Sequence, residues 1–449
     1  MRFFFTFSIL MFIVSPLCFA KESVTTNLQN LNLEQCIAIG TEKNASVDEA
    51  NANIEEFRAR LAEVQANYYP KLSVLGYVAP MFSVTGDAST NDVDRDFGLG
   101  SWGPSTHLEA LFAMPIYTFG RLEAGELAAK SRLDVEKSRL REAQNHVKVE
   151  VSKFYYSYLY AATILPHLTK AKDRIIEIQE KAQELYDEAT GKVTKVDLMK
   201  LRFANTEIQK YILLADEGKT LALAALKHTM GLDNNASLTL LDKKIKKPGK
   251  INLADEETLV QQAIENRPEW EQIRAGLKAV AALRKSEQLS NRPVIFVAGT
   301  LESNWSPTRD DAKNPYHYDP YNDLFGGVAI GFKLDFDWAL QKAKVDAANA
   351  TMQQVNAKKK LAVTGIPLQI MKSRSEVIRH GKQIKLSRKA VKASNKWIVF
   401  SGAAYASGTG EVKDVLEGMA AMLSAQRDYY EGMLNYYVAV AELNYALGK

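Results

Sequence analysis

The sequence predicts a mainly helical chain with long β-strands, built from two copies of one structural unit. Residues 31–231 and 252–447 share one order of elements: a helix, two alternating β-segments, a very long helix, a glycine turn and a returning helix. A turn glycine precedes an aspartate by six residues in both halves, as Gly191 precedes Asp197 and Gly408 precedes Asp414. The shared order and the shared spacing together predict an internal two-fold repeat.

The N-terminus has the features of a secretion signal. Arg2 supplies a positive charge, and residues 3–14 form an apolar stretch. Cys18-Phe19-Ala20 places small residues at the −3 and −1 positions of a cleavage site, so we expect residues 1–20 to be removed as a signal peptide. The bulky Leu17 argues against the rival prediction, lipid attachment at Cys18.

Composition excludes several classes of protein. Export would leave Cys36 as the only cysteine, which rules out an internal disulfide and favours a small buried residue on a helix. A formal net charge of +4 gives no support to a nucleic-acid partner. Beyond residue 20, no apolar run approaches the roughly 18 residues of a transmembrane helix. Any membrane role would therefore depend on β-strands, whose sequence signal is weaker.

The first repeat, residues 21–231, should begin with one helix over 33–68. A β-hairpin is then expected over 70–117, with an acidic loop at 86–103 between its strands. Apolar and polar residues alternate in its first strand, which predicts two unlike faces: Leu72, Val74, Val78, Phe82 and Val84 against Lys71, Ser73, Tyr77, Ser83 and Thr85.

The second repeat, residues 252–449, has a matching hairpin over 293–336, with a loop at 306–323. Its alternating segments hold about 10 to 14 residues each, which suits strands that cross a bilayer at a tilt. Because an open sheet edge is not tolerated in lipid and closed barrels start at about eight strands, four strands per chain require an oligomer. Strand geometry alone does not choose between two chains and three.

Each hairpin leads into a very long predicted helix. The first, over 119–186, would extend about 100 Å at about 1.5 Å per residue. Its apolar residues recur three, four or seven apart, as in a coiled coil, and Pro166 should kink it. The second runs over 338–404, with a distortion expected at Gly365–Pro367. Residues 232–251 between the repeats are polar and basic, and are expected to form a solvated linker.

Residue patterns for catalysis are missing from the sequence. The six histidines are scattered, without the spacing of a metal site, and the glycine pair Gly408-Thr409-Gly410 lacks the context of a nucleotide-binding loop. We therefore expect no enzyme activity, no catalytic residue, no metal and no cofactor.

Four phrases, together with the order of elements, resemble the TolC-like outer membrane efflux protein (outer membrane factor) family. The resemblance covers the whole mature chain and rests on these phrases at these spacings: Leu33-Glu34-Gln35-Cys36-Ile37-Ala38, Tyr68-Tyr69-Pro70-Lys71-Leu72, Pro115-Ile116-Tyr117-Thr118-Phe119-Gly120-Arg121 and Tyr405-Ala406-Ser407-Gly408-Thr409-Gly410. The resemblance implies a homotrimer with a twelve-stranded β-barrel in the outer membrane and a helical tunnel in the periplasm.

The resemblance also implies a function and partners. It points to a passive outer membrane exit duct of a tripartite efflux pump or type I secretion system. A periplasmic adaptor and an inner membrane transporter would dock at the tip, beside the turns at Gly191 and Gly408. The alternative is a periplasmic coiled-coil structural or adaptor protein without a pore. That alternative explains the helices but leaves the four two-faced strands without a role.

The resemblance assigns candidate residues at the tunnel aperture. Asp414 and Glu417 match the two positions of the family's acidic ring, and Tyr405 matches a tyrosine that helps hold such gates shut. Asp197 is a further candidate for an acidic ring. Both aspartates have a second interpretation as plain carboxylates at a helix start. Gly410 stands where those gates have an arginine, so the closing contacts here must differ or be weaker.

Overall fold

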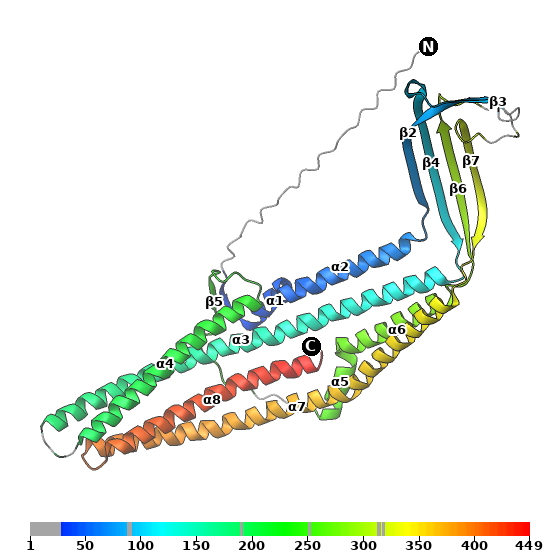
Figure 1. Cartoon of the computed structure of the whole chain (residues 1–449). Coiled ribbons are helices and arrows are strands. Elements are labelled where there is room, and N and C mark those ends of the chain that lie inside the picture. The colour runs from blue at the N-terminus through cyan, green and yellow to red at the C-terminus, as the bar shows by residue number, and fades with distance from the viewer. Residues whose placement is uncertain are drawn as a thin grey trace.

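The computed structural model describes residues 28–87, 92–188, 191, 193–249, 253–311, 316 and 319–449. The predicted signal peptide and the residues directly before Gly191 lie outside these ranges. A β-sheet stands at one end of the molecule (Figure 1), and the two long helices α3 (Arg121–Asp187) and α7 (Trp338–Ala406) run from it to the tip at the other.

The two long helices match the prediction closely. They contain 67 and 69 residues, which corresponds to about 100 Å each, and they continue through Pro166 and Pro367. α3 begins two residues later than expected, because Phe119 and Gly120 adopt positive φ angles of 55° and 85°. No helix in the described part of the chain combines the length and the apolar character that crossing a bilayer requires.

The four long strands form one antiparallel sheet to which both repeats contribute. The strand order is β3-β2-β4-β6-β7, and β4 of the first repeat pairs with β6 of the second, with Thr106 opposite Trp305. The strand bounds are β2 Lys71–Asp87, β3 Asp92–Asp96, β4 Trp102–Tyr117, β6 Val294–Trp305 and β7 Asp323–Lys333.

Two predictions about these strands were wrong in detail. Residues 86–103 are not all loop, because β2 continues to Asp87 and β3 pairs with it, Thr85 lying opposite Asp94. A three-residue helix, Leu99–Ser101, then leads into β4. β7 ends at Lys333 rather than near residue 336, since the carboxylate of Asp337 caps α7 by accepting a 3.0 Å hydrogen bond from the N–H of Leu340.

The expected single helix over 33–68 is two helices, α1 (Leu33–Lys43) and α2 (Ala45–Ala66), which meet at Asn44. The backbone N–H of Asn44 donates to the carbonyl of Gly40 at the end of α1. The side-chain oxygen of Asn44 accepts a 2.8 Å hydrogen bond from the N–H of Ser46 and so caps the start of α2. The side-chain amide also donates to the carbonyl of Thr229 at 2.7 Å. A short polar side chain that can bond the backbone both ways ends one helix and starts the next.

The second repeat has a similar break, where α5 (Glu256–Asn266) meets α6 (Pro268–Gln288). The returning helices are α4 (Lys195–Thr229) and α8 (Val412–Ala446). In the half nearer the sheet, α2 and α6 both pack on α3, and α6 also packs on α7. In the tip half, the packing order becomes α4-α3-α8-α7.

The segment between the repeats was expected to be a solvated linker, but part of it is ordered and buried. Its strand β5 (Leu238–Leu240) pairs in parallel with β1 (Leu28–Leu31), and Ile245 is buried. The N–H of Ile245 donates to Oγ1 of Thr163 in α3 at 2.9 Å. The missed strand has only three residues, too few to show a period. Residues 250 and 251 of the predicted linker lie outside the described ranges.

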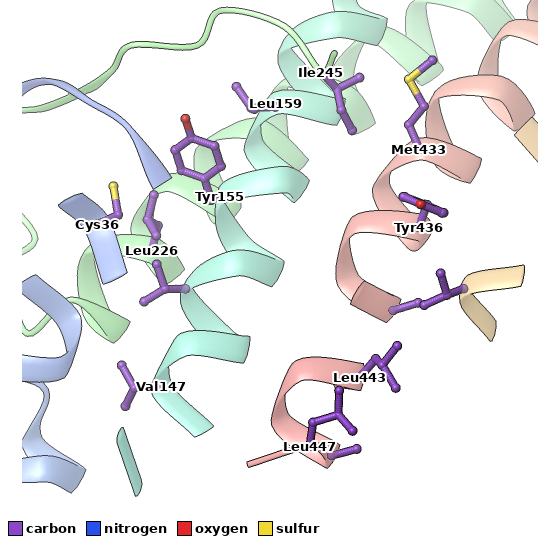
Figure 2. Close-up of a cluster of buried hydrophobic side chains, with 14 of the residues drawn as sticks. Cys36, Val147, Tyr155, Leu159, Leu226, Ile245, Met433, Tyr436, Leu443 and Leu447 are labelled. Atoms are coloured by element: carbon purple, nitrogen blue, oxygen red, sulfur yellow. The ribbon is translucent and has the colours of Figure 1, made fainter. Parts of the chain in front are cut away.

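The largest hydrophobic core lies where these small elements meet the long helices. Figure 2 shows Cys36, Val147, Tyr155, Leu159 and Leu226 on one side of it, and side chains of α8 on the other, among them Met433, Tyr436 and Leu443. Cys36 has no exposed surface, which confirms the expected buried position, and burial raises the pKa of its thiol to about 12. The thiol is therefore held in its neutral, unreactive form.

Candidate functional site

The second tip turn is a compact helix end closed by glycine. Gly408 has a φ of +78°, as a tight turn requires. Its N–H donates to the carbonyl of Tyr405 at 3.0 Å, and the N–H of Thr409 donates to the carbonyl of Ala404 at 3.0 Å. These two bonds form a Schellman motif, which satisfies carbonyls at the end of α7 that would otherwise lack donors.

Gly410 is held tightly inside the same turn. Its N–H donates to the carbonyl of Ala404 at 2.9 Å. A β-carbon added at Gly410 would lie 2.9 Å from Cβ of Ala404 and 3.0 Å from two backbone atoms of the α7 end. The turn in this form therefore has no space for an arginine, or for any other side chain, at position 410.

The first tip turn also contains a glycine with positive φ, Gly191 at +69°. After it, Thr194 and Asp197 form a capping box at the start of α4. Oγ1 of Thr194 accepts from the N–H of Asp197 at 3.2 Å, and Oδ2 of Asp197 accepts from the N–H of Thr194 at 3.2 Å. The ammonium of Lys200 contacts the other carboxylate oxygen at 3.2 Å.

This bonding decides what Asp197 can do. Hydrogen bonds from Thr194, assisted by Lys200, hold the pKa of its carboxyl below the usual range. Both oxygens are engaged within the first turn of α4, which favours the helix-start interpretation of this residue over a ring of free charges. Its place in an acidic ring stays a prediction.

Asp414 and Glu417 lie in the first two turns of α8, and both are exposed. Within the described residues, Asp414 makes no ion pair. Glu417 has only a loose contact with Lys413, at 3.9 Å between Nζ and Oε1. Unlike Asp197, these two carboxylates remain available to solvent and to ions. The structure therefore leaves them free for the aperture role, which stays a prediction.

Tyr405, in the last turn of α7, lies between the two helical hairpins of the tip. Its ring packs against two buried clusters, one of which joins Leu198 and Leu201 of α4 to Val412 of α8. Its hydroxyl is buried and has no hydrogen-bond partner in the described part of the chain. Burial, together with the negative charge of Asp197, raises the pKa of Tyr405. The side chain therefore joins the hairpins by packing, with its hydrogen-bonding capacity unused.

An apolar groove of about 800 Å³ runs from the tip between α4 and α8, with α3 as its floor. Apolar side chains such as Phe203, Ile208 and Met419 line it, and Glu417 lies at its border. The groove therefore places the aperture candidate Glu417 beside an apolar surface.

The other end of the molecule holds a polar cluster that the sequence did not reveal. On one face of the sheet, Nδ1 of His107 lies 2.6 Å from Oδ1 of Asn304, whose amide donates to Oε1 of Glu302 at 2.8 Å. Tyr77 stacks on the imidazole with ring centroids 4.8 Å apart. Glu109 lies directly opposite Glu302 in the strand register.

The cluster was missed because its members come from both repeats. Alternation within β4 and within β6 predicts which side chains share a face of each strand, but the pairing of the two strands decides which residues meet. Only the register between β4 and β6 brings His107 to Asn304. Among the described residues, no group of three or more histidine, cysteine or acidic side chains is arranged to hold a metal ion.

A family model supports the interpretation of the second repeat. Residues 259–449 match the outer membrane efflux protein family. No curated protein sequence matches the chain.

Solved structures support the fold of the whole chain. The outer-membrane channel OprN matches with a TM-score of 0.75 at 14% identity, covering 93% of this chain and 89% of its own. The Campylobacter jejuni CmeC outer membrane channel matches with a TM-score of 0.74 at 17% identity, covering 93% and 85%. The outer membrane protein VceC from Vibrio cholerae matches with a TM-score of 0.72 at 16% identity, covering 93% and 96%. The predicted fold class, long helices with four membrane-type strands, is confirmed.

Proposed function

We propose that this chain is a member of the outer membrane efflux protein family and serves as the passive exit duct of a tripartite efflux pump or type I secretion system. As a member of that family it would be an outer membrane protein, with its helical tunnel in the periplasm. Substrate would pass from an inner membrane transporter and a periplasmic adaptor through the duct to the exterior. The energy for transport would come from the inner membrane partner.

The observation that carries this proposal is the pair of open edges on the sheet. Among the described residues, β7 is bonded only to β6, and β2 is bonded to β4 along Lys71–Phe82 and to β3 from Ser83 onward. Unpaired N–H and C=O groups cannot remain open in lipid. An antiparallel contact between β2 of one copy and β7 of the next satisfies both edges and continues the alternation of strand direction.

Three copies would close a twelve-stranded barrel. The two open edges have similar lengths, about 12 residues on β2 and 11 on β7, so no long stretch of either is left unpaired. One face of the sheet carries the row Leu324, Val328, Ile330 and Phe332, all exposed in the single chain. This apolar row suits lipid contact, and the face with His107 and Glu109 suits a watery lumen.

The tip is proposed as the docking and gating end. The turns at Gly191 and Gly408 lie about 100 Å from the sheet, a distance set by α3 and α7. The apolar groove beside Glu417 supports contact with a helical adaptor there. Asp414 and Glu417 would form a ring of like charges around the aperture, three copies of each, which attracts cations.

Reconstitution of the purified mature protein into a planar lipid bilayer tests the proposal, with the mass in detergent measured alongside. Discrete conductance steps from a trimer are expected. A monomer without conductance would contradict the duct and favour a periplasmic coiled-coil protein without a pore. A dimer with conductance would keep the channel and correct the number of strands.

A further inference from the structure

The tip half of α7 carries a row of lysines that the proposed duct does not use. All five are exposed, and they follow one another at alternating intervals of three and four residues: Lys382, Lys385, Lys389, Lys392 and Lys396. None of them makes an ion pair within the described residues. The row extends about 21 Å along the helix.

The local charge is far from the average of the chain. Residues 371–400 contain nine lysines and arginines and one acidic residue, Glu376, whereas the formal net charge of all 449 residues is only +4. Like charges three and four residues apart repel one another and weaken a helix. The row therefore costs α7 some stability, and no ion pair in the described part of the chain offsets that cost.

The row faces away from the returning helix. The guanidinium of Arg374 donates to the carbonyl of Ala254, in the segment before α5, at 3.2 Å. At about 100° per residue, Lys385 and Lys392 lie within about 20° of Arg374 around the helix axis. Ile384, which is buried in the core against α8, lies on another side. The lysines thus occupy the face of the helical layer that also carries the segment between the repeats.

The spacing identifies the shape of a partner. Residues alternately three and four apart form one straight stripe when another helix runs alongside, as in a coiled coil. We propose that this stripe docks an acidic α-helix of a partner protein, with carboxylates at the same alternating spacing along α7. The inference rests on the proposed function, in which a periplasmic protein binds the helical end. It adds the partner's charge, its conformation and its place on the second hairpin.

A second copy of the chain is a poorer occupant. α4 lies at the opposite edge of the helical layer from α7, so it is the helix that a neighbouring copy would bring to α7. It carries six basic and four acidic side chains, without an acidic stripe. An acidic helix suits the basic stripe better, since opposite charges paired across an interface steer association and align the partners.

The test uses the intact trimer in detergent and two synthetic helical peptides as probes. One peptide has glutamates at alternating three- and four-residue spacing, and the other has the same composition with the glutamates permuted around the helix. Binding is followed by fluorescence anisotropy over a range of salt concentrations. The striped peptide should bind more tightly than the permuted one, and its affinity should fall as salt rises.

Two variants with the same loss of charge separate the row from general basicity. Replacing the five row lysines by glutamine should weaken binding of the striped peptide about tenfold or more, since each exposed pair contributes a small part. The control replaces five other exposed lysines by glutamine and should bind as the wild type does: Lys243, Lys244, Lys358, Lys359 and Lys360.

Three outcomes would overturn the inference: equal binding of both peptides, wild-type binding by the row variant, or a changed trimer mass in the row variant. The last would place the row between copies instead. Conductance of the same preparations keeps the two proposals apart. A wild type that fails to conduct contradicts the duct, whereas a conducting wild type with unselective peptide binding contradicts only the acidic-helix partner.

Discussion

The hydroxyl of Tyr155 in α3 donates a 2.8 Å hydrogen bond to Oδ2 of Asp242, which lies 87 positions further along the chain. Tyr155 is almost fully buried in the core of Figure 2. The other oxygen of Asp242 pairs with the ammonium of Lys246 at 2.6 Å. This relationship fastens the segment between the repeats to a helix that runs from the sheet to the tip.

Removing the hydroxyl with Tyr155→Phe should lower stability by about 1–3 kcal/mol, because a buried bond to a charged acceptor is lost while the ring still fills the core. The thermal midpoint in detergent measures the effect. The exposed Tyr186→Phe serves as a control and should change stability by less than about 0.5 kcal/mol. An equal midpoint for both variants would mean that the Tyr155 hydrogen bond adds nothing to stability.

The carboxylate of Asp242 should make the stability of the fold depend on pH. Hydrogen bonds from Lys246 and then from Tyr155 hold the pKa of Asp242 below its ordinary value of 3.8. Since the folded state binds the proton less tightly than the unfolded chain, the stabilisation is complete above that value and is lost as the pH falls through the lowered pKa. Asp242→Asn should remove this part of the acid sensitivity, as seen in midpoints recorded from about pH 2 to pH 5, a range that extends below the ordinary carboxyl pKa.

The glycine turn of the second hairpin predicts opposite effects of one substitution at two sites. Gly408→Ala should destabilise the tip by about 1–2 kcal/mol, because φ at +78° suits only glycine well. Gly218→Ala, in the middle of α4 with open space around its position, should stabilise the chain by about 0.5–1 kcal/mol. Hydrogen exchange of the tip amides and the thermal midpoint would measure the two effects. Protection of the tip unchanged in Gly408→Ala would count against a strained turn.

The aperture assignment predicts a change in ion flow. Asp414→Ala with Glu417→Ala should raise single-channel conductance and weaken block by multivalent cations. The half-blocking concentration of a trivalent cation should rise about tenfold, as expected for losing roughly 1 kcal/mol or more of attraction to nearby charges. Planar bilayer recordings measure both quantities.

A matched control for the aperture is the pair Glu55→Ala and Glu56→Ala, two exposed carboxylates of α2 in the sheet half of the molecule. Removal of these charges should leave the block unchanged. If the tip and control variants conduct and block alike, Asp414 and Glu417 do not lie at the narrowest point.

Neighbouring positions on β7 test which face of the sheet meets lipid. Ile330→Lys places a charge on the apolar face and should cost about 2–4 kcal/mol near the bilayer centre, so little oligomer should reach the outer membrane. Ala329→Lys lies on the other face and should be tolerated, because that face is expected to be wet. Outer membrane fractionation and heat-modifiable migration give the readout. If Ile330→Lys were tolerated and Ala329→Lys were not, the face with Ala329 would be the one that meets lipid.

Local patterns were sufficient for the long elements. Period-two alternation placed β7 within three residues, and the glycines Gly191 and Gly408 located the two tip turns, where both have positive φ. Asn44 was missed because a single polar residue in a periodic stretch does not signal a break unless its partner, the carbonyl of Thr229, is known. β1 and β5 stabilise each other across about 200 residues and are too short to show a pattern alone.

The tip candidates show the same limit. Spacing from a glycine located Asp197 and Asp414 equally well, yet only the structure separates them. Thr194 and Lys200 engage the carboxylate of Asp197, whereas Asp414 stays exposed. A capping box depends on the conformation of the residue before the helix, which the residue types alone do not fix.

Breaks at Asn44 and Arg267 interrupt the shorter helices, whereas α3 and α7 run without a break from sheet to tip. The core around Tyr155 and Tyr436 therefore holds each long helix at mid-length, so each helix can act as a lever about that core. A sideways force on the tip must either bend the tip half of the helix or tilt the other half against the sheet. A closed barrel would resist the tilt, so any opening at the tip should come from bending of α3 and α7 between the core and the glycine turns.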